Sequence, residues 1–391
     1  MKQNVCVVTG SRADYGLLRP LLFRLRDDNE ISLQLVVTGS HLSRAFGNTQ
    51  SEIGKDGFVI NSRIAIPMAG DSKAEMAKAT GYALSAFAGC FKKIRPDLLV
   101  VLGDRYEIFA AAAAASILGI AVAHISGGDV TEGALDDTFR HCITKMSFLH
   151  FPGSLQSAGR IIQLGENPER VFNAGEPGVE NCLFIVPLSL AELQKYIDID
   201  IIHKPYAIVT FHAATMDNDS VKTQADELVL ALESFPDMNF IITKSNADAG
   251  GRTINSIWDK RQKNHPNWLM VASMGVEQYI SAMKYAQMLI GNSSSGIVEA
   301  PAMKMPSVNI GDRQKGRMLA GSVICCAPVA QDIISAIKRA LSPEFRAVAA
   351  NVINPFGEGH TSQRIYEVVK KFLAESPHNM KKGFYDLEVI T

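Results

Sequence analysis

Short apolar runs rich in Val, Ile and Leu recur along the chain, and each ends in a turn rich in Gly, Ser or Asp. A segment with helical periodicity follows most of these turns. This alternation predicts parallel sheets with helices on both faces. Runs such as LLVVL (98–102) are apolar at every position, which favours strands buried on both sides. The predicted strands are Asn4–Thr9, Leu33–Val37, Leu98–Leu102, Ala121–Ile125, Phe148–Phe151, Tyr206–Phe211, Phe240–Thr243, Trp268–Ala272, Met288–Ile290 and Ser307–Ile310.

The strand and helix pattern is interrupted once, between Gly178 and Pro205. A chain of 391 residues is too long for one ordinary core, because domains usually span ~100–200 residues. We therefore expect an α/β protein with two doubly wound, Rossmann-like domains that face a cleft, at residues 1–175 and 176–361. Residues 362–391, which begin with a helix, are expected to pack back on the first domain. Open sheets of this kind bind ligands at the carboxyl ends of their strands.

Composition narrows the classes of function. The formal net charge of −1 argues against a general electrostatic grip on nucleic acid or an anionic membrane. Six cysteines without metal-ligand spacing are expected to be reduced thiols in the cytoplasm. No apolar run approaches the ~18–20 residues of a membrane span. We expect a cytoplasmic homodimer or homotetramer. Its anionic ligand should be held locally, by a few residues positioned in the binding site.

The GNSSSG segment at 291–296 predicts an anion site, because it follows a strand and opens a helix. Backbone N–H groups at a helix start, with the hydroxyls of Ser293 and Ser294, suit a diphosphate. A serine-capped helix without ligand is the alternative. Glu299, farther along that helix, could accept two ribose hydroxyls or be a surface charge. Arg313, in NIGDRQKGR, could pair with phosphate or lie in a solvated loop.

Carboxylates gather in two segments of the first half. Asp104 and Arg105 of LGDRYE directly precede an alanine-rich helix, so Asp104 could serve in chemistry or cap that helix. The segment HISGGDVTEGALDDTFRH contains Asp129, Glu132 and Asp136 beside a Gly-Gly turn. Carboxylates in different environments suit acid/base catalysis. They could also hold Mg²⁺, but no ligand pattern specifies a metal.

Three more candidates follow strands: Arg12 in GSRAD, His212 in FHAAT and Asn246 in SNADAG. Arg12 could bind phosphate or substrate, whereas a lone histidine such as His212 is more often structural. The chain contains neither G-x-G-x-x-G after its first strand nor G-x-x-x-x-G-K-[ST]. These absences disfavour NAD-dependent and P-loop chemistry.

Together, these motifs resemble in order and spacing the hydrolysing UDP-N-acetylglucosamine 2-epimerases of bacterial sialic acid synthesis, from Val5 to about Ile365. The resemblance implies a GT-B fold and the reaction UDP-GlcNAc + H₂O → N-acetylmannosamine + UDP, through a 2-acetamidoglucal-like intermediate and without cofactor or metal. It implies acid/base roles for Asp104 and Asp136, and Asp129 and His212 complete the catalytic candidates. The residues that it implies for binding UDP or its sugar are Arg12, Arg105, His212, Asn246, Ser293, Ser294, Glu299 and Arg313.

One position departs from the family pattern. Many members carry a glutamate with a catalytic role where this chain has Ser126. Serine cannot act there as a base without help, so we expect Asp129 or Glu132 to take over. A similar subgroup acts on UDP-2,4-diacetamido-2,4,6-trideoxyglucose for legionaminic acid, and this substrate stays open beside UDP-GlcNAc. A non-hydrolysing epimerase, a GT-B glycosyltransferase and a non-catalytic nucleotide-sugar sensor also stay open.

Overall fold

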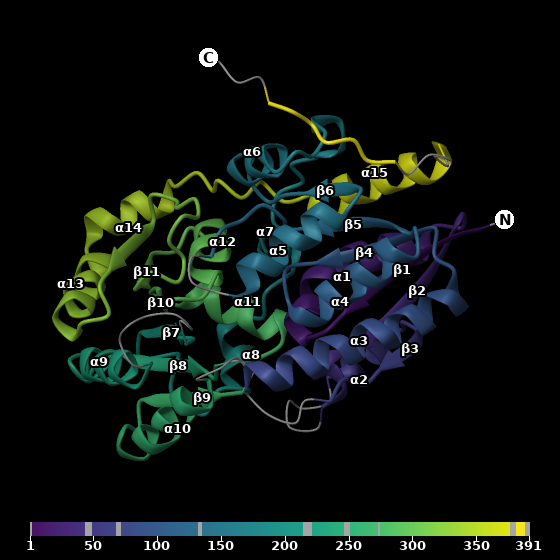
Figure 1. Ribbon diagram of the computed structural model, residues 1–391. Helices are drawn as coiled ribbons and strands as arrows, with labels where there is room; N and C mark the ends of the chain where they lie inside the picture. The colour runs from purple at the N-terminus through teal and green to yellow at the C-terminus, as the bar shows by residue number, and fades with distance from the viewer. Residues whose placement is uncertain are drawn as a thin grey trace. The chain divides into compact units, whose positions relative to one another are not determined.

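The computed structural model describes residues 2–43, 49–67, 72–131, 135–213, 221–245, 251–272, 274–375 and 381–387. The chain forms two compact units, whose elements are labelled in Figure 1. Unit 1 consists of Met1–Asp129, Leu135–Glu180 and Gly359–Thr391, and unit 2 of Val130–Ala134 and Asn181–Glu358. The domain bounds expected from the sequence, 1–175 and 176–361, stay a prediction.

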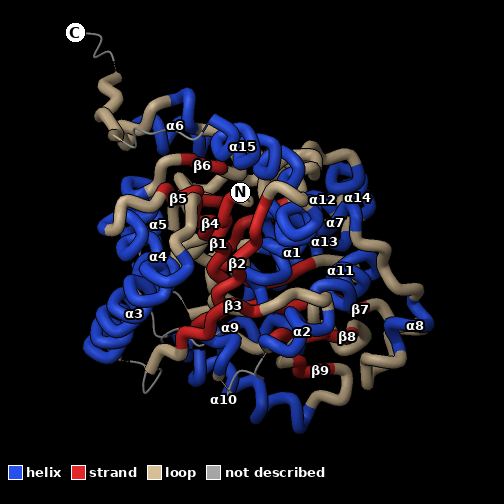
Figure 2. Tube along the Cα trace, turned by 90° about the vertical axis from the view of Figure 1, so that its right-hand side faces the viewer, coloured by secondary structure: helices blue, strands red, loops and turns tan. Residues whose placement is uncertain are grey.

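The described part of unit 1 contains a parallel sheet of six strands in the order β3-β2-β1-β4-β5-β6 (Figure 2). The chain enters the sheet in the middle, builds outward to β3, and returns to the other side of β1 with β4. The strand order therefore reverses between β1 and β4, which is where doubly wound sheets bind ligands. The strands are β1 (Gln3–Thr9), β2 (Ile31–Thr38), β3 (Ile60–Ile64), β4 (Leu98–Leu102), β5 (Ala121–Ile125) and β6 (Leu149–Phe151).

Helices cover both faces of this sheet because side chains of its buried strands alternate between the faces. In β1, Val5 and Val7 pack in a core with α1 and α15, while Cys6 and Val8 pack in a second core with α3 and α4. The alanines at 110–115 of α4 are all buried, and such small side chains allow close helix packing. The helices are α1 (Arg12–Asp27), η1 (Gly39–Leu42), α2 (Gln50–Lys55), α3 (Lys73–Ile94), α4 (Tyr106–Ile117), α5 (Leu135–Met146), α6 (Leu155–Gln163), η3 (Pro168–Arg170), α7 (Pro177–Phe184) and α15 (Thr361–Glu375).

Unit 2 repeats this topology. Its described part contains a parallel sheet of six strands in the order β12-β11-β10-β7-β8-β9, and the order reverses between β7 and β10. The strands are β7 (Tyr206–Thr210), β8 (Asn239–Thr243), β9 (Trp268–Val271), β10 (Leu289–Gly291), β11 (Ser307–Ile310) and β12 (Val323–Cys326). The helices are α8 (Leu190–Gln194), α9 (Val221–Glu233), α10 (Gly251–Arg261), η4 (Gln262–Asn264), α11 (Val276–Tyr285), α12 (Ser295–Ala302), α13 (Ala330–Leu341) and α14 (Pro343–Ala350).

The C-terminal segment belongs to unit 1. Helix α15 contributes Ile365 and Val369 to the core that also holds α1. At its edge, the Tyr366 hydroxyl donates to Asp28 Oδ2 over 2.6 Å. Farther along, Lys382 contacts the buried carboxylate of Glu166 over 2.6 Å. Helix α15 and Lys382 are thus part of the packing of unit 1.

The sequence prediction was incomplete at two strands. Neither β3 nor β12 was predicted, because INSRI and VICC are short and partly exposed, with burial limited to alternate positions or less. Helix α4 begins at Tyr106, four residues before the alanine run that predicted it. All six cysteines are free thiols.

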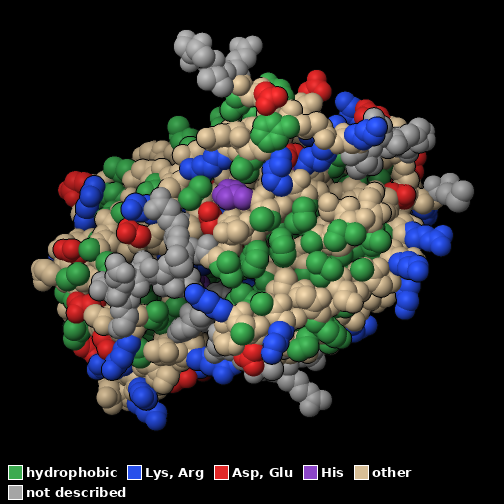
Figure 3. Space-filling model, viewed as in Figure 1, with side chains coloured by type: hydrophobic (Ala, Val, Ile, Leu, Met, Phe, Trp, Pro, Cys, Tyr) green, Lys and Arg blue, Asp and Glu red, His purple; other side chains and the backbone are tan. Residues whose placement is uncertain are grey.

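Positive and negative side chains are interspersed on the surface drawn in Figure 3. On the face drawn in Figure 3, Lys and Arg side chains are interspersed with Asp and Glu over the described residues, in line with the net charge of −1. None of the helices in the described ranges combines the length and hydropathy that a bilayer crossing requires.

Gly291, the last residue of β10, provides a test of the fold at the strand reversal in unit 2. Its φ is +136°, and a Cβ there would lie 1.9 Å from the carbonyl oxygen of Thr210 on the paired strand β7. We expect Gly291→Ala to destabilise the protein by roughly 2–4 kcal/mol, from backbone strain and overpacking. The midpoint of thermal unfolding measures the change.

Gly81→Ala is the matched control. Gly81 lies inside α3, and a Cβ there would meet no atom within 4 Å. Because alanine favours helices over glycine by about 0.8–1 kcal/mol, this variant should unfold at a slightly higher temperature. Equal midpoints for both variants would contradict the close approach of β10 to β7.

Candidate functional site

The candidate residues of both units gather at the strand reversals. In unit 1, Arg12 follows β1, and Asp104 and Arg105 follow β4. In unit 2, His212 follows β7 and Ser293 follows β10. Because these strands are parallel neighbours, their carboxyl ends share one edge of each sheet. The fold therefore places the motifs of each unit together at the edge where such sheets bind ligands.

Asp104 forms an ion pair and does not cap the next helix. The N-cap of α4 is Arg105, without a side-chain cap hydrogen bond, so the capping alternative was wrong. Asp104 Oδ2 accepts from Nη2 of Arg140, a residue that is only 5% exposed. Arg140 Nη1 also donates to the carbonyl oxygen of Asp129 over 2.9 Å and to Asp137 Oδ1 over 3.2 Å. Arg140 thus connects the end of β4 with the loop after β5 and with α5.

Asp129 is held inside the protein. Its side chain is 3% exposed, and its Oδ1 accepts a short hydrogen bond from the hydroxyl of Ser157 in α6. His124, at the end of β5, contacts the Gly103 carbonyl through Nε2 over 2.8 Å. Burial lowers the pKa of His124 to about 3, so the ring is neutral at pH 7. Its role here is structural, through the hydrogen bond to Gly103.

Two further candidates of unit 1 lie in the first turns of helices. Asp136 lies in the first turn of α5 with a half-buried side chain. Arg12 opens α1, and its Nη1 lies 3.4 Å from Glu52 Oε1. Glu132, the alternative to Asp129, lies outside the described residues.

A buried acidic pair, Asp14 and Glu107, was not singled out by sequence reasoning. Glu107 is fully buried and its Oε1 accepts from Arg105 Nε over 2.6 Å. Glu107 Oε2 and Asp14 Oδ2 are also buried, and neither has a hydrogen-bond partner among the described residues. Burial raises the pKa of Asp14 to about 6, although Arg105 opposes the shift. Both residues lie within recognised motifs, but burial next to a second carboxylate is visible only in the structure.

In unit 2, Asn292 joins three of the predicted motifs. Its side chain accepts from the backbone N–H of His212 and donates to the carbonyl of the same residue, each over 2.8 Å. Its own carbonyl accepts from Arg313 Nη1 over 3.0 Å and from Gln314 Nε2 over 2.8 Å. FHAAT, GNSSSG and NIGDRQKGR therefore meet at one amide that is 2% exposed. A single Asn inside a motif gives no sequence signal for this role.

His212 is a neutral ring at pH 7. Burial, reinforced by the positive charge of Arg313, lowers its pKa to about 3. Its Nδ1 contacts the hydroxyl of Ser245 over 3.2 Å. His212 can therefore act as a hydrogen-bonding group or proton acceptor, but it carries no permanent positive charge at pH 7. Asn246, the next residue after Ser245, lies outside the described residues.

The predicted anion site lies at the start of α12. Ser294 is the N-cap residue and makes no side-chain cap hydrogen bond, so it is not a capping serine. Ser293 Oγ accepts from the N–H of Ser295 over 3.3 Å. One turn on, Glu299 Oε2 is buried without a hydrogen-bond partner in the described part of the chain. Burial raises the pKa of Glu299, so the carboxylate is not the exposed surface charge that was its alternative reading.

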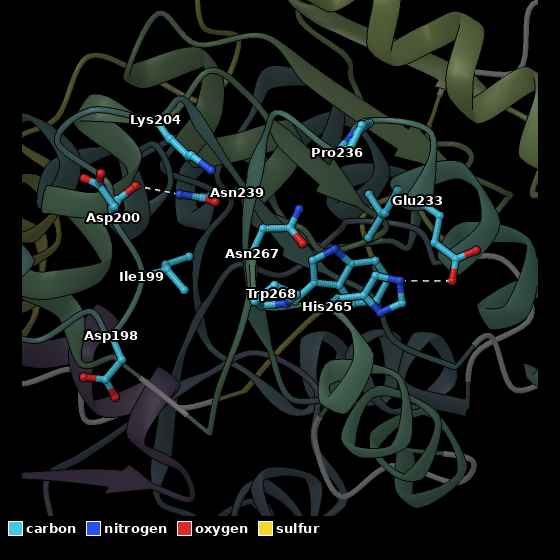
Figure 4. A pocket seen from close by; sticks show the side chains of 12 residues that line it. Asp198, Ile199, Asp200, Lys204, Glu233, Pro236, Asn239, His265, Asn267 and Trp268 are labelled. Atoms are coloured by element: carbon cyan, nitrogen blue, oxygen red, sulfur yellow. Dashed lines mark hydrogen bonds and ion pairs between the residues drawn. The ribbon is translucent and has the colours of Figure 1, made fainter.

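A cavity of about 520 Å³ lies elsewhere in unit 2. It is lined at the starts of β8 and β9, where Figure 4 shows Asn239 directed at Asp200 and His265 at Glu233. This is the amino edge of the sheet, opposite the edge where such sheets bind ligands. Among the described residues, no three His, Cys, Asp or Glu side chains gather in a way that could hold a metal ion.

The raised pKa of Asp14 makes stability depend on pH. Between pH 3.8 and about 6, the folded protein retains a proton that the unfolded chain releases, so stability falls as pH rises through this window. We expect Asp14→Asn to stabilise the protein by about 1–3 kcal/mol at pH 8 and to have little effect near pH 3.5. Chemical denaturation at the two pH values measures the difference. Asp27→Asn, at an exposed carboxylate of the same helix, is the control; a loss of stability in Asp14→Asn at pH 8 would contradict the burial.

Comparison with known proteins gives relatives that match nearly the whole chain. A Campylobacter jejuni protein named GDP/UDP-N,N'-diacetylbacillosamine 2-epimerase (hydrolyzing) is 38% identical over 88% of this chain and 89% of its own length. The Escherichia coli Polysialic acid biosynthesis protein P7 is 38% identical over 100% and 99%. A Legionella pneumophila protein named UDP-N,N'-diacetylbacillosamine 2-epimerase (hydrolyzing) is 34% identical over 95% and 96%.

Solved structures share the fold at lower identity. The UDP-GlcNAc 2-epimerase of Neisseria meningitidis, bound to UDP-GlcNAc, has a TM-score of 0.79 at 18% identity and covers 94% of this chain and 100% of that one. The Methanocaldococcus jannaschii UDP-GlcNAc 2-epimerase, in complex with UDP-GlcNAc and UDP, has a TM-score of 0.80 at 19% identity and the same coverage. The predicted GT-B class of two Rossmann-like units is confirmed. Since the profile described as UDP-N-acetylglucosamine 2-epimerase also matches residues 24–370, the chain belongs to the UDP-N-acetylglucosamine 2-epimerase family.

Proposed function

We propose that this protein is a hydrolysing 2-epimerase of UDP-2-acetamido sugars, which releases UDP and the 2-epimer of the free sugar. One observation carries the proposal: both units present polar groups at their strand reversals, and these groups differ in kind. The reversal in unit 1 holds carboxylates beside arginines. The reversal in unit 2 holds a helix start and a buried carboxylate, one oxygen of which has no partner among the described residues. The first set suits proton transfer at a sugar, and the second suits a nucleoside diphosphate.

Unit 2 is proposed to bind UDP. The N–H groups and hydroxyls at Ser293 and Ser294 would hold the diphosphate, with Arg313 beside them. Among the described residues, one buried oxygen of Glu299 has no hydrogen-bond partner, and a buried acceptor of this kind is destabilising unless a donor reaches it. The hydroxyls of a ribose are suitable donors. Asn246 keeps its expected role in sugar or nucleotide binding as part of this proposal.

Unit 1 is proposed to carry the chemistry at C1 and C2. Asp104 is the first acid/base group, because Arg140 holds it at the strand reversal. Arg12 and Arg105 would bind the sugar or its phosphate, and Asp136 is a second carboxylate near the same edge. His212 of unit 2, a neutral ring, would donate to or accept from the leaving diphosphate. Asp129 stays a candidate, although its oxygen is already bonded to Ser157.

Two substrates are supported by different observations. The motif resemblance favours UDP-GlcNAc, with N-acetylmannosamine as the product for sialic acid synthesis. The printed names of the Campylobacter and Legionella relatives favour UDP-N,N'-diacetylbacillosamine. Both substrates carry the C2 proton and the C1–O bond to UDP on which the proposed chemistry acts. Activity is therefore measured with both substrates.

UDP binding tests the nucleotide site alone. Glu299→Ala and Arg313→Ala should each weaken UDP binding about 10- to 150-fold, because a lost hydrogen bond to a charged group is worth roughly 1.5–3 kcal/mol. Titration calorimetry with UDP measures the affinity. Glu344→Ala, at an exposed position of α14, is the control and should bind as the parent does. Unchanged affinity in both folded site variants would remove the proposed UDP site.

The chemistry is tested at Asp104. Asp104→Asn should lower kcat by ~10²–10⁴ and leave UDP affinity nearly intact, as for a lost general acid or base. Asp137→Asn is the matched control, because Asp137 also pairs with Arg140 but is given no role at the sugar. In D₂O, the product should carry one deuterium at C2. A product without deuterium would mean that the C2–H bond is never broken, and would favour a glycosyltransferase or a simple hydrolase.

A further inference from the structure

Ser126 has an unusual backbone and a specific partner. It follows β5 with φ +61°, a left-handed conformation that is uncommon for residues other than glycine. Its backbone N–H donates to the carbonyl of Phe151 at the end of β6 over 2.9 Å. Its hydroxyl donates to Oε2 of Glu176 over 2.8 Å. The strained turn thus directs a short hydroxyl at a carboxylate fifty residues away in the sequence.

Glu176 is fixed beyond the carboxyl ends of β5 and β6. It directly precedes α7, and its carbonyl accepts from the N–H of Val179 and from the hydroxyl of Thr361. Its side chain is 7% exposed and lies over Gly153, the second residue after β6. A Cβ at Gly153 would lie 1.9 Å from Glu176 Oε1 and 2.4 Å from its Cγ. The backbone of unit 1 therefore leaves room for this carboxylate, which a side chain at 153 would displace.

The neighbouring carboxylates of this edge accept from other side chains. Asp104 is ion-paired with Arg140, and Asp129 is bonded to the Ser157 hydroxyl. Glu176 Oε2 accepts from the neutral hydroxyl of Ser126. Ser126 stands at the position where the chain departs from the family pattern.

We propose that Glu176 supplies the second acid/base carboxylate of the reaction, with Ser126 as the residue that positions it. The carboxylate would reach the place of the missing glutamate from the loop before α7 instead of from the end of β5. This inference rests on the proposed function and deepens it. It replaces Asp129 and Glu132 as the substitute for that glutamate.

The reaction needs two such groups because C2 is inverted. One carboxylate takes the C2 proton; the C–H electron pair forms the C1=C2 bond, and the electron pair of the C1–O bond leaves with UDP. In the second step a water oxygen bonds to C1, and C2 receives a proton on its opposite face from the second carboxyl group. That group takes a proton from the water in return, and the first proton passes to solvent. Asp104 and Glu176 would be the two groups, one on each face.

The main test is Glu176→Gln, which keeps an oxygen to accept from Ser126 and removes the acid/base function. Its kcat should fall by ~10²–10⁴, with KM and UDP affinity changed only a few-fold. Ser126→Ala should lose about tenfold or less, because the carboxylate remains. Glu180→Gln is the matched control: it is a buried glutamate of α7, the helix that Glu176 precedes, and it also accepts from a serine, Ser362, over 2.6 Å. Its kcat should stay near that of the parent.

A rescue variant distinguishes a chemical role of Glu176 from a purely structural one. The two side chains touch, so Ser126→Glu combined with Glu176→Ser should return a carboxylate to nearly the same point from β5. We expect this double variant to be at least tenfold faster than Glu176→Ser alone. A purely structural role for Glu176 would not be restored in this way. If Glu176→Gln does not fold, the double variant decides: a folded, inactive double variant overturns the proposal.

These experiments separate a failure of the proposed function from a failure of the role given to Glu176. If the parent protein releases UDP from neither UDP-GlcNAc nor UDP-N,N'-diacetylbacillosamine, the proposed function fails. If the parent is active and Glu176→Gln retains its kcat, the function stands and Glu176 is not an acid/base group. A large loss in Asp129→Asn together with a mild effect in Glu176→Gln would return the role to Asp129. Deuterium incorporation at C2 in each active variant reports that the same reaction is being followed.

Discussion

The constraint on which the structure depends is the reversal of strand order within each parallel sheet. Parallel pairing sends every carboxyl end to the same edge, and the reversal leaves two adjacent loops that run to opposite sides. In unit 1 these loops follow β1 and β4, and in unit 2 they follow β7 and β10. Residues far apart in the sequence thereby become neighbours at the ends of paired strands. This topology is what brings the separate motifs together into one site in each unit.

Buried polar groups then fix the loops to one another. Arg140 connects the loops after β4 and β5, and Asn292 connects those after β7, β10 and β11. Both side chains are almost fully buried, so each must satisfy several hydrogen bonds at once. Such a network is rigid because moving one loop would leave polar groups of the others unpaired. Rigid loops are what a site for oriented proton transfer requires.

Sequence patterns predicted the fold well where hydrophobicity decides it. LLVVL at 98–102 and the run at 121–125 are strands with the predicted bounds, because burial on both faces demands apolar residues throughout. β3 and β12 were missed because their partly exposed positions tolerate polar residues. The motifs predicted which loops matter, but not which side chains meet. The contact of Ser126 with Glu176 and the hydrogen bonds of Asn292 to three motifs depend on three-dimensional proximity. A single sequence does not reveal such contacts.

The route of the chain through the two units sets an order of assembly. Unit 2 is almost entirely one continuous stretch, Asn181–Glu358, whereas unit 1 takes its last helix, α15, from beyond that stretch. During synthesis on the ribosome, the sheet of unit 1 is therefore made first but lacks one covering helix until residues 361–375 have been synthesised. Meanwhile Val5, Val7 and their neighbours expose the apolar surface that Ile365 and Val369 later cover. While Asn181–Glu358 is being synthesised, the nascent first unit must therefore be protected from aggregation or stay incompletely folded.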